Sequence, residues 1–196
     1  MRGYNRVMTT AMPLLNLTCH PATPAPVVRS LEAKIGFNPD GSVGLFYCLR
    51  GDIIRLRIPE ELVPQRLDHL WEHTCFEAFI GVRGETAYRE FNFSPSGQWA
   101  AYAFEDYRQP AETLLETEPP IIIARRYAGR LEVDVTLGPQ ALPPNDARVP
   151  WQIGLSAVIE EADTVDGSHS YWALRHPNER PDFHHRDAFA LDWPFA

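Results

Sequence analysis

An aromatic-rich stretch from Trp71 to Tyr107 constrains the fold of this chain more than any other part of the sequence. It holds ten of the chain's 22 Trp, Tyr and Phe residues, so we expect the core and any aromatic-lined site to centre there. Residues 74–80 and 88–94 alternate with the period of two that is typical of β-strands with two distinct faces. In the second of these segments, Phe91 and Phe93 point one way and polar side chains point the other. The stretch therefore predicts neighbouring antiparallel strands.

A predicted hairpin inside this stretch defines a candidate binding face. The run from Ser94 to Gly97 has the composition of a turn and returns the chain into a strand over residues 98–104. If Phe93 pairs with Gln98, one face of the hairpin forms a shallow groove, suited to a ligand that stacks on rings and is hydrogen-bonded at its edges. The alternative is an ordinary solvated outer face of a sheet. The face carries Tyr88, Glu90, Asn92 and Trp99 beside Ala101 and Ala103.

The rest of the chain predicts a single all-β domain. The sequence has 196 residues, 44% of them hydrophobic, with 18 prolines and 12 glycines that favour many short strands over long helices. We expect an antiparallel β-sandwich of about ten strands over residues 27–196, in an immunoglobulin-like or jelly-roll arrangement. One short helix is predicted over Glu60–Leu70. The other strands are predicted at 31–37, 43–49, 54–58, 121–126, 130–137, 151–159, 168–174 and 188–193.

Charge and the N-terminal residues indicate where the protein acts. Residues 1–26 are predicted to be a flexible leader, with Met1, Met8 or Met12 as possible start residues and no clean cleavage site of a secretory signal. No run of about 18 apolar residues occurs, so we expect no membrane partner and a cytoplasmic location. The net charge of −8 disfavours nucleic acid as a partner. The three widely spaced cysteines predict neither a disulfide framework nor a zinc motif.

Several short motifs together resemble a known family. The spacing of Trp71, Glu77, Tyr88, Glu90 and Gly97 is their most specific feature, and the match spans most of the chain from about residue 28 onward. The sequence resembles bacterial DOMON-like proteins, relatives of the family 9 carbohydrate-binding modules. The matching motifs are Leu70-Trp71-Glu72, Cys75 to Ile80, Tyr88 to Gly97, Tyr171 to Leu174 and Pro181 to His184.

The resemblance implies a sugar site. Relatives that bind carbohydrate hold a sugar ring between tryptophan faces and hydrogen-bond its hydroxyls with acidic and amide groups. Carried over to this sequence, the resemblance places Trp71, Glu77 and Glu90 in such a site, with Trp172 as a candidate second platform. The sequence therefore predicts a non-enzymatic protein that binds a small saccharide and needs no cofactor. The predicted ligand-binding residues are Trp71, Glu77, Tyr88, Glu90, Asn92, Trp99 and Trp172.

Four alternatives to a sugar site stay open. Some DOMON relatives bind haem through axial side chains, and all three methionines fall in the predicted leader, so a haem site here would use His73, His176, His184 or His185. The last three of these histidines, close to acidic residues, form a weaker candidate metal site. A glycosidase needs two carboxyl groups that flank a sugar bond, and Glu77 and Glu90 are the candidates, but on adjacent strands of one sheet they are better placed to hydrogen-bond sugar hydroxyls. The aromatic face is also suited to binding a partner protein.

Overall fold

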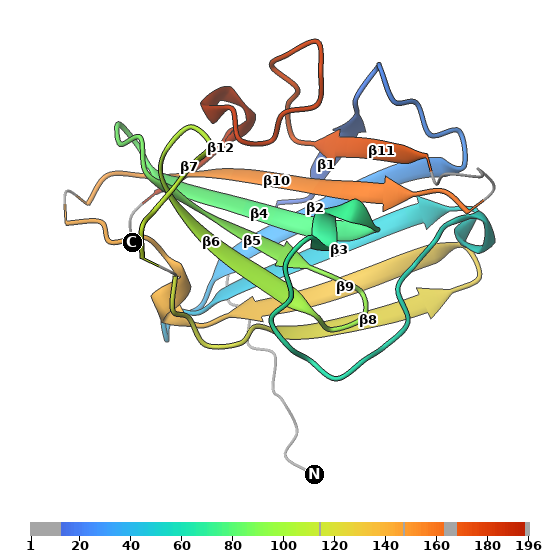
Figure 1. Ribbon diagram of the computed structural model, residues 1–196, viewed down its shortest axis with the longest axis horizontal. Coiled ribbons are helices and arrows are strands. Elements are labelled where there is room, and N and C mark those ends of the chain that lie inside the picture. Colours follow the sequence, from blue (N-terminus) through green and yellow to red (C-terminus); the bar gives the residue numbers. More distant parts are fainter. Residues whose placement is uncertain (1–12, 114, 147, 163–167, 195–196) are drawn as a thin grey trace.

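Twelve antiparallel strands form the fold in a computed structural model that describes residues 13–113, 115–146, 148–162 and 168–194 (Figure 1). The predicted all-β antiparallel sandwich is confirmed, with two more strands than the ten expected. The described residues form no α-helix, only short 3-10 turns. The strands are β1 (Leu15–Cys19), β2 (Val28–Phe37), β3 (Val43–Gly51), β4 (Cys75–Val82), β5 (Tyr88–Phe93), β6 (Trp99–Asp106), β7 (Gln109–Pro110), β8 (Ile121–Tyr127), β9 (Arg130–Leu137), β10 (Trp151–Glu160), β11 (His169–Ala173) and β12 (Leu191–Trp193).

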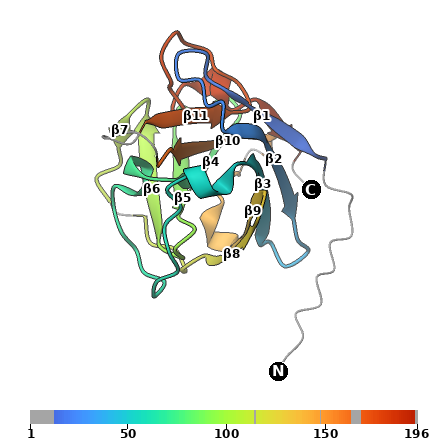
Figure 2. The same ribbon diagram turned by 90° about the vertical axis from the view of Figure 1, so that its right-hand side faces the viewer.

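The strands make two layers joined by β1. One layer runs in the order β7-β6-β5-β4-β10-β11 and the other in the order β2-β3-β9-β8, with β1 between β11 and β2 and with β12 on β10. Figure 2 shows β4, β5 and β6 on one side of the molecule and β2, β3 and β9 on the other. The inward side chains of both layers form one hydrophobic core. Tyr47 of β3 crosses it and donates a hydrogen bond to the backbone oxygen of Glu77 at 2.8 Å.

The layer that contains β4 is covered on both of its faces, which explains why every residue of β4 is buried. Its inner face packs Phe76, Ala78 and Ile80 into the core. Its outer face is partly covered by the segment that follows β11, where Phe189 packs against Phe79 and other aromatic side chains. The part of the outer face that this segment leaves open is the pocket described below.

Residues 60–70, predicted to be a helix, are irregular until a 3-10 turn, η2 (Leu70–Glu72), begins. Pro64 lies in the middle of this segment and disfavours helix there because it lacks a backbone N–H. The segment instead follows the β5–β6 turn. The backbone N–H of Leu62 donates to the oxygen of Ser96, and that of Leu67 donates to the oxygen of Trp99. Leu70 is buried, whereas Leu62 and Leu67 are exposed.

Two further sequence predictions are wrong in part. The strand expected over residues 54–58 is replaced by a 3-10 turn, η1 (Ile53–Arg55), and one bridge from Leu56 to Glu161. Ile54, expected in the core, is exposed. The predicted leader does not extend to residue 26, because Leu15–Cys19 forms β1 and pairs with both β2 and β11. Residues 1–12, with all three methionines, and the predicted turn at residues 166–167 lie outside the described residues.

Candidate functional site

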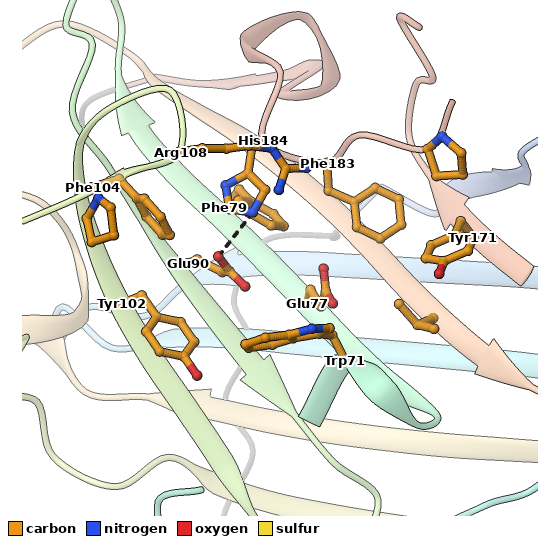
Figure 3. A pocket seen from close by; sticks show the side chains of 13 residues that line it. Trp71, Glu77, Phe79, Glu90, Tyr102, Phe104, Arg108, Tyr171, Phe183 and His184 are labelled. Atoms are coloured by element: carbon orange, nitrogen blue, oxygen red, sulfur yellow. Dashed lines mark ion pairs between the residues drawn. The ribbon is translucent and has the colours of Figure 1, made fainter. Parts of the chain in front are cut away.

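A pocket of about 440 Å³ opens on the outer face of the β4 layer (Figure 3). This volume is within the range of small-molecule sites, which are usually concave and lined by apolar rings around a few polar groups. Glu77 on β4 and Glu90 on β5 form its floor, and the loop before β12 and the β6–β7 turn border it. The aromatic side chains that line it are Trp71, Phe79, Tyr102, Phe104, Tyr171 and Phe183, and the other polar ones are Arg108 and His184.

The two floor carboxyl groups come from neighbouring strands. Asn92 of β5 lies opposite Glu77 of β4, and Phe79 of β4 lies opposite Glu90 of β5, so the two glutamates are diagonal neighbours on one face. Both are buried, with 3% of Glu77 and 5% of Glu90 exposed. Glu77 accepts a hydrogen bond from the hydroxyl of Ser156 at 3.2 Å, and Glu90 accepts one from the amide of Asn92 at 2.7 Å.

Burial makes both carboxyl groups weak acids. Desolvation raises the pKa of Glu90 to about 7, although the hydrogen bond from Asn92 and the charge of Arg108 act in the opposite direction. Desolvation, and then the nearby charge of Glu90, also raise the pKa of Glu77 well above its ordinary value, and the hydrogen bond from Ser156 opposes this rise. Strongly raised pKa values inside a pocket are typical of functional sites.

His184 borders the pocket as a neutral imidazole. Burial and the charge of Arg108 lower its pKa to about 4, against an opposing effect of Asp182. The Tyr88 hydroxyl oxygen accepts the backbone N–H of Arg108 at 3.2 Å and is hydrogen-bonded to Nδ1 of His184 at 2.8 Å. Nε2 of the imidazole lies 3.6 Å from Oε2 of Glu90, the contact dashed in Figure 3. With a neutral ring this contact is polar and not an ion pair.

Asp182 holds the loop that carries His184. Its carboxylate accepts hydrogen bonds from the Tyr107 hydroxyl at 2.8 Å, from the Arg108 guanidinium at 3.0 Å and from the Asn178 amide at 3.0 Å. It also accepts the backbone N–H of His184 at 3.2 Å. Burial alone would raise the pKa of Asp182, but these hydrogen bonds and the charge of Arg108 lower it below the ordinary value. The loop and the β6–β7 turn are therefore fixed to one another at the rim of the pocket.

Trp71 is the exposed aromatic platform of the site. It lies in η2, immediately before β4, and 38% of its surface is accessible. Its ring centroid lies 5.0 Å from that of His69 and 6.1 Å from that of Tyr102. In Figure 3 the indole lies beside the two floor carboxyl groups, on the side opposite His184 and Phe79. One face of a large ring is therefore available to a ligand that enters the pocket.

The predicted hairpin register is wrong by one residue. Phe93 pairs with Trp99 instead of Gln98, because five residues and not four connect the strands, and Ser94 N–H bonds to the Gln98 oxygen. A shift of one residue moves every side chain of the strand to the other face. Trp99 therefore lies in the core with 6% of its surface exposed. Tyr102 and Phe104 take the pocket face predicted for Trp99, Ala101 and Ala103.

The second predicted platform is also a core residue. Trp172 of β11 packs in the hydrophobic core with 6% of its surface exposed, and its indole N–H donates to the hydroxyl of Ser170 at 3.0 Å. Its neighbour Tyr171 points to the pocket instead. Tyr88 and Asn92 lie on the predicted face, but both are buried beneath the pocket, where they support His184 and Glu90. Trp71, Glu77 and Glu90 line the pocket directly.

The sequence reasoning missed most of the rim. Tyr102 and Phe104 follow from the hairpin once its register is correct, but nothing local indicates that Arg108 and Phe183 approach them. His184 was considered only as a ligand of metal or haem. The alternative metal site of His176, His184 and His185 is not formed, because the described residues contain no group of three His, Cys, Asp or Glu side chains placed to hold an ion.

A test of the floor carboxyl groups follows from the raised pKa of Glu90. Its pKa is higher in the folded state than in the unfolded chain, so its contribution to stability is present below about pH 4.5 and is lost as the pH rises through about 7. The loss is about 3 kcal/mol in the free energy of unfolding. Glu90→Gln should remove this fall between pH 5 and pH 8 in urea denaturation. Glu61→Gln, at an exposed position, is the control and should keep the fall; an equal fall in Glu90→Gln would contradict the assignment.

A second test concerns Asp182, which holds the loop that carries His184. Asp182→Ala leaves four donors without their carboxylate and should lower the free energy of unfolding by about 3 kcal/mol. Faster hydrogen exchange of residues 178–184 should accompany the loss, because the backbone N–H of His184 is among the freed donors. Asp187→Ala is the matched control, since that side chain is 73% exposed. Equal stability of the two variants would show that Asp182 does not hold the loop.

Comparisons with known proteins show the fold but no family. No protein-family model matches the sequence, and no curated protein matches it. The DOMON-like relationship stays a prediction. A structure described as a candidate carbohydrate-binding protein from Bacteroides uniformis is similar over 90% of this chain and 83% of that one, with a TM-score of 0.63 and 12% identity.

Two further similar structures belong to carbohydrate-binding modules. A family 9 carbohydrate-binding module from Caldicellulosiruptor kristjanssonii in complex with glucose matches 82% of this chain and 74% of that one, with a TM-score of 0.49 and 9% identity. A module of the same family and organism in complex with cellotriose has a TM-score of 0.44 and 8% identity, over 82% of this chain and 72% of that one. At such low sequence identities, structural similarity shows a shared fold and nothing more. The fold that this chain shares with the Bacteroides protein is the antiparallel β architecture.

Proposed function

We propose that this protein binds a small saccharide, without chemical conversion, in the pocket between Trp71 and His184. The observation that carries the proposal is the exposed indole of Trp71 beside the two buried carboxyl groups of Glu77 and Glu90. Sugar rings present flat C–H surfaces that pack on an indole face, and their hydroxyls hydrogen-bond well to carboxylates. The pocket supplies both kinds of contact within one small volume.

The remaining polar groups of the pocket match a polyhydroxylated ligand. Nε2 of His184 and the guanidinium of Arg108 are polar groups at the rim, and the hydroxyl of Tyr171 is present on the other side. A sugar hydroxyl both donates and accepts, so it is suited to a mixture of donors and acceptors. The fold shared with the Bacteroides structure, described as a candidate carbohydrate-binding protein, is consistent with this assignment.

A non-catalytic role follows from the placement of the two glutamates. Glycosidases use two carboxyl groups that flank the scissile bond from opposite sides. Glu77 and Glu90 project from neighbouring strands of one sheet into the same floor. They would contact one side of a bound ring, and the described lining residues include no carboxyl group besides these two. We therefore expect binding and no hydrolysis.

Calorimetric titration with monosaccharides and disaccharides of glucose, galactose and mannose tests the proposal. A binding sugar should also shift the emission of Trp71, because this indole lines the pocket, whereas Trp99, Trp151, Trp172 and Trp193 are not among the lining residues. Tyr127→Ala, at an exposed position on the opposite layer, is a control that should bind as the native protein does. Absence of heat and of any emission change across the panel would contradict saccharide binding.

A haem site centred on His184 is the second candidate function. Of the four histidines considered for axial ligation, His184 is the one that lines the pocket. The others are engaged elsewhere: His73 bonds to Glu160 at 2.9 Å, His176 to the oxygen of Thr18 at 2.8 Å, and His185 to the N–H of Asp187 at 3.2 Å. Nδ1 of His184 is held by Tyr88, which leaves Nε2 toward the aromatic pocket. A Soret band on addition of hemin, lost in His184→Ala, would favour this function over sugar binding.

A further inference from the structure

We propose that the saccharide bound in this pocket carries a cationic amino group, which lies over Glu77 and Glu90 and against the surrounding aromatic rings. This inference rests on the proposed saccharide function and specifies the chemical class of the sugar. It is carried by the geometry of the pocket. Two acidic side chains share a small buried floor among aromatic rings, and the guanidinium that lines the pocket is paired with Asp182.

Arg108 is the nearest full positive charge, but its partner is not a floor glutamate. Its guanidinium lies 3.0 Å from the carboxylate of Asp182, which also holds Tyr107 and Asn178. His184, the other basic residue among those that line the pocket, is neutral at pH 7 because of its lowered pKa. A ligand cation would therefore stabilise the charged form of two carboxyl groups that burial otherwise keeps weakly acidic.

The walls of the pocket suit a cation as well as a sugar ring. Trp71, Tyr102, Phe104 and Tyr171 surround the carboxyl groups in Figure 3. Aromatic faces attract ammonium groups through their quadrupole, most strongly where water is excluded. Carboxylates combined with several aromatic faces accept the N–H groups of a cation and therefore favour an amine over a hydroxyl. A neutral sugar could take the same hydrogen bonds from amide side chains, which carry no cost of burying charge.

The groups that face the two carboxyl groups determine how binding depends on pH. Ser156 of β10 faces Glu77, while Asn92 of β5 and His184 of the loop before β12 face Glu90. Arg108 of the β6–β7 turn and Asp182 form an ion pair, and their charges shift the pKa of His184 in opposite directions. Tyr102 and Tyr171 border the floor, and Tyr88, Tyr47 and Cys75 lie beneath it, all neutral at pH 7.

Glu90 then supplies a signature that a neutral ligand would lack. Below its pKa of about 7 the carboxyl group is protonated, and an ammonium ligand must displace that proton in order to bind the carboxylate. Affinity for an amine should therefore be about tenfold lower at pH 5 than at pH 6. A neutral sugar requires no proton release, so its affinity should change little over the same range.

The decisive experiment compares sugars that differ only by a hydroxyl and an amine. Glucosamine, galactosamine, mannosamine and the β-1,4-linked glucosamine disaccharide are titrated by calorimetry against glucose, galactose, mannose and cellobiose at pH 5, 6 and 7. We expect at least one amino sugar to bind about tenfold or more tightly than its hydroxyl counterpart at pH 7. The advantage should shrink at pH 5 and collapse toward a ratio of one in Glu90→Gln.

Controls separate failure of this inference from failure of the proposed function. Glu77→Gln is a second variant in case Glu90→Gln folds poorly, and Glu61→Gln, exposed and remote from the pocket lining, should keep the native ratio. If a neutral sugar binds as tightly as its amino counterpart, the amine is wrong and saccharide binding stands. If tetramethylammonium binds and no sugar does, the saccharide function is wrong and this inference falls with it. Absence of binding by every probe overturns both.

Discussion

Replacing Trp71 with alanine is expected to weaken saccharide binding about 100-fold while leaving thermal stability nearly unchanged. The indole is the largest exposed apolar surface at the pocket, and burying an aromatic face on a ligand is worth about 2 to 3 kcal/mol. Trp71 belongs to none of the buried hydrophobic clusters. We therefore expect the melting temperature of Trp71→Ala to lie within about 3 °C of the native value, a shift of about 1 kcal/mol.

Calorimetry and a thermal melt on the same sample measure both halves of this prediction. Trp71→Phe is the matched variant, because it keeps an aromatic face of smaller area and should lose less affinity than Trp71→Ala. Tyr127→Ala controls for the removal of an exposed ring elsewhere. A variant that melts much earlier than the native protein would show that Trp71 is part of the core, and native affinity in Trp71→Ala would exclude the indole as a platform.

The opposite result is expected for Trp99 and Trp172, which the sequence predicted to be ligand contacts. Both indoles lie in the core with 6% of their surface exposed. Truncating a buried tryptophan to alanine costs about 3 to 5 kcal/mol, because apolar contacts are lost and a cavity is left. Each alanine variant should therefore melt about 10 °C or more below the native protein.

Chemical denaturation of Trp172→Ala and Trp99→Ala provides the direct measurement of this cost. Trp172→Phe and Trp99→Phe keep part of the buried volume and should lose less stability than the alanine variants. Any of the four that stays folded at low temperature should still bind saccharide, since neither side chain lines the pocket. A fully stable Trp172→Ala that no longer binds would restore the prediction made from the sequence and contradict the structure.

The fold was predictable because period-two alternation and turn residues are local signals. The segment around Phe91 and Phe93 identified a strand with one apolar face, and the structure confirms it as β5. Local signals failed where another part of the chain decided the conformation. Residues 60–70 were predicted to be a helix, but Pro64 and backbone hydrogen bonds to Ser96 and Trp99 keep them irregular. β1 was missed because its partners, β2 and β11, are known only from the tertiary structure.

The site was predictable only in part. The family resemblance placed Trp71, Glu77 and Glu90 together, and all three line the pocket. Trp99 was misplaced because the predicted turn was one residue too short, and a single step of register exchanges the two faces of a strand. Arg108 and His184 were missed as pocket residues because they meet across 76 residues of sequence, through Asp182 and Tyr88. No local pattern encodes such a contact.

A crystal structure of the protein with a bound sugar tests the central claim most directly. We expect the ring of the best-binding sugar from the calorimetric panel to lie on the indole of Trp71, with polar groups within hydrogen-bond distance of Glu77 and Glu90. If the sugar is an amino sugar, its nitrogen should lie over the two carboxyl groups. Density for the sugar on another surface, with this pocket filled by water alone, would contradict the account.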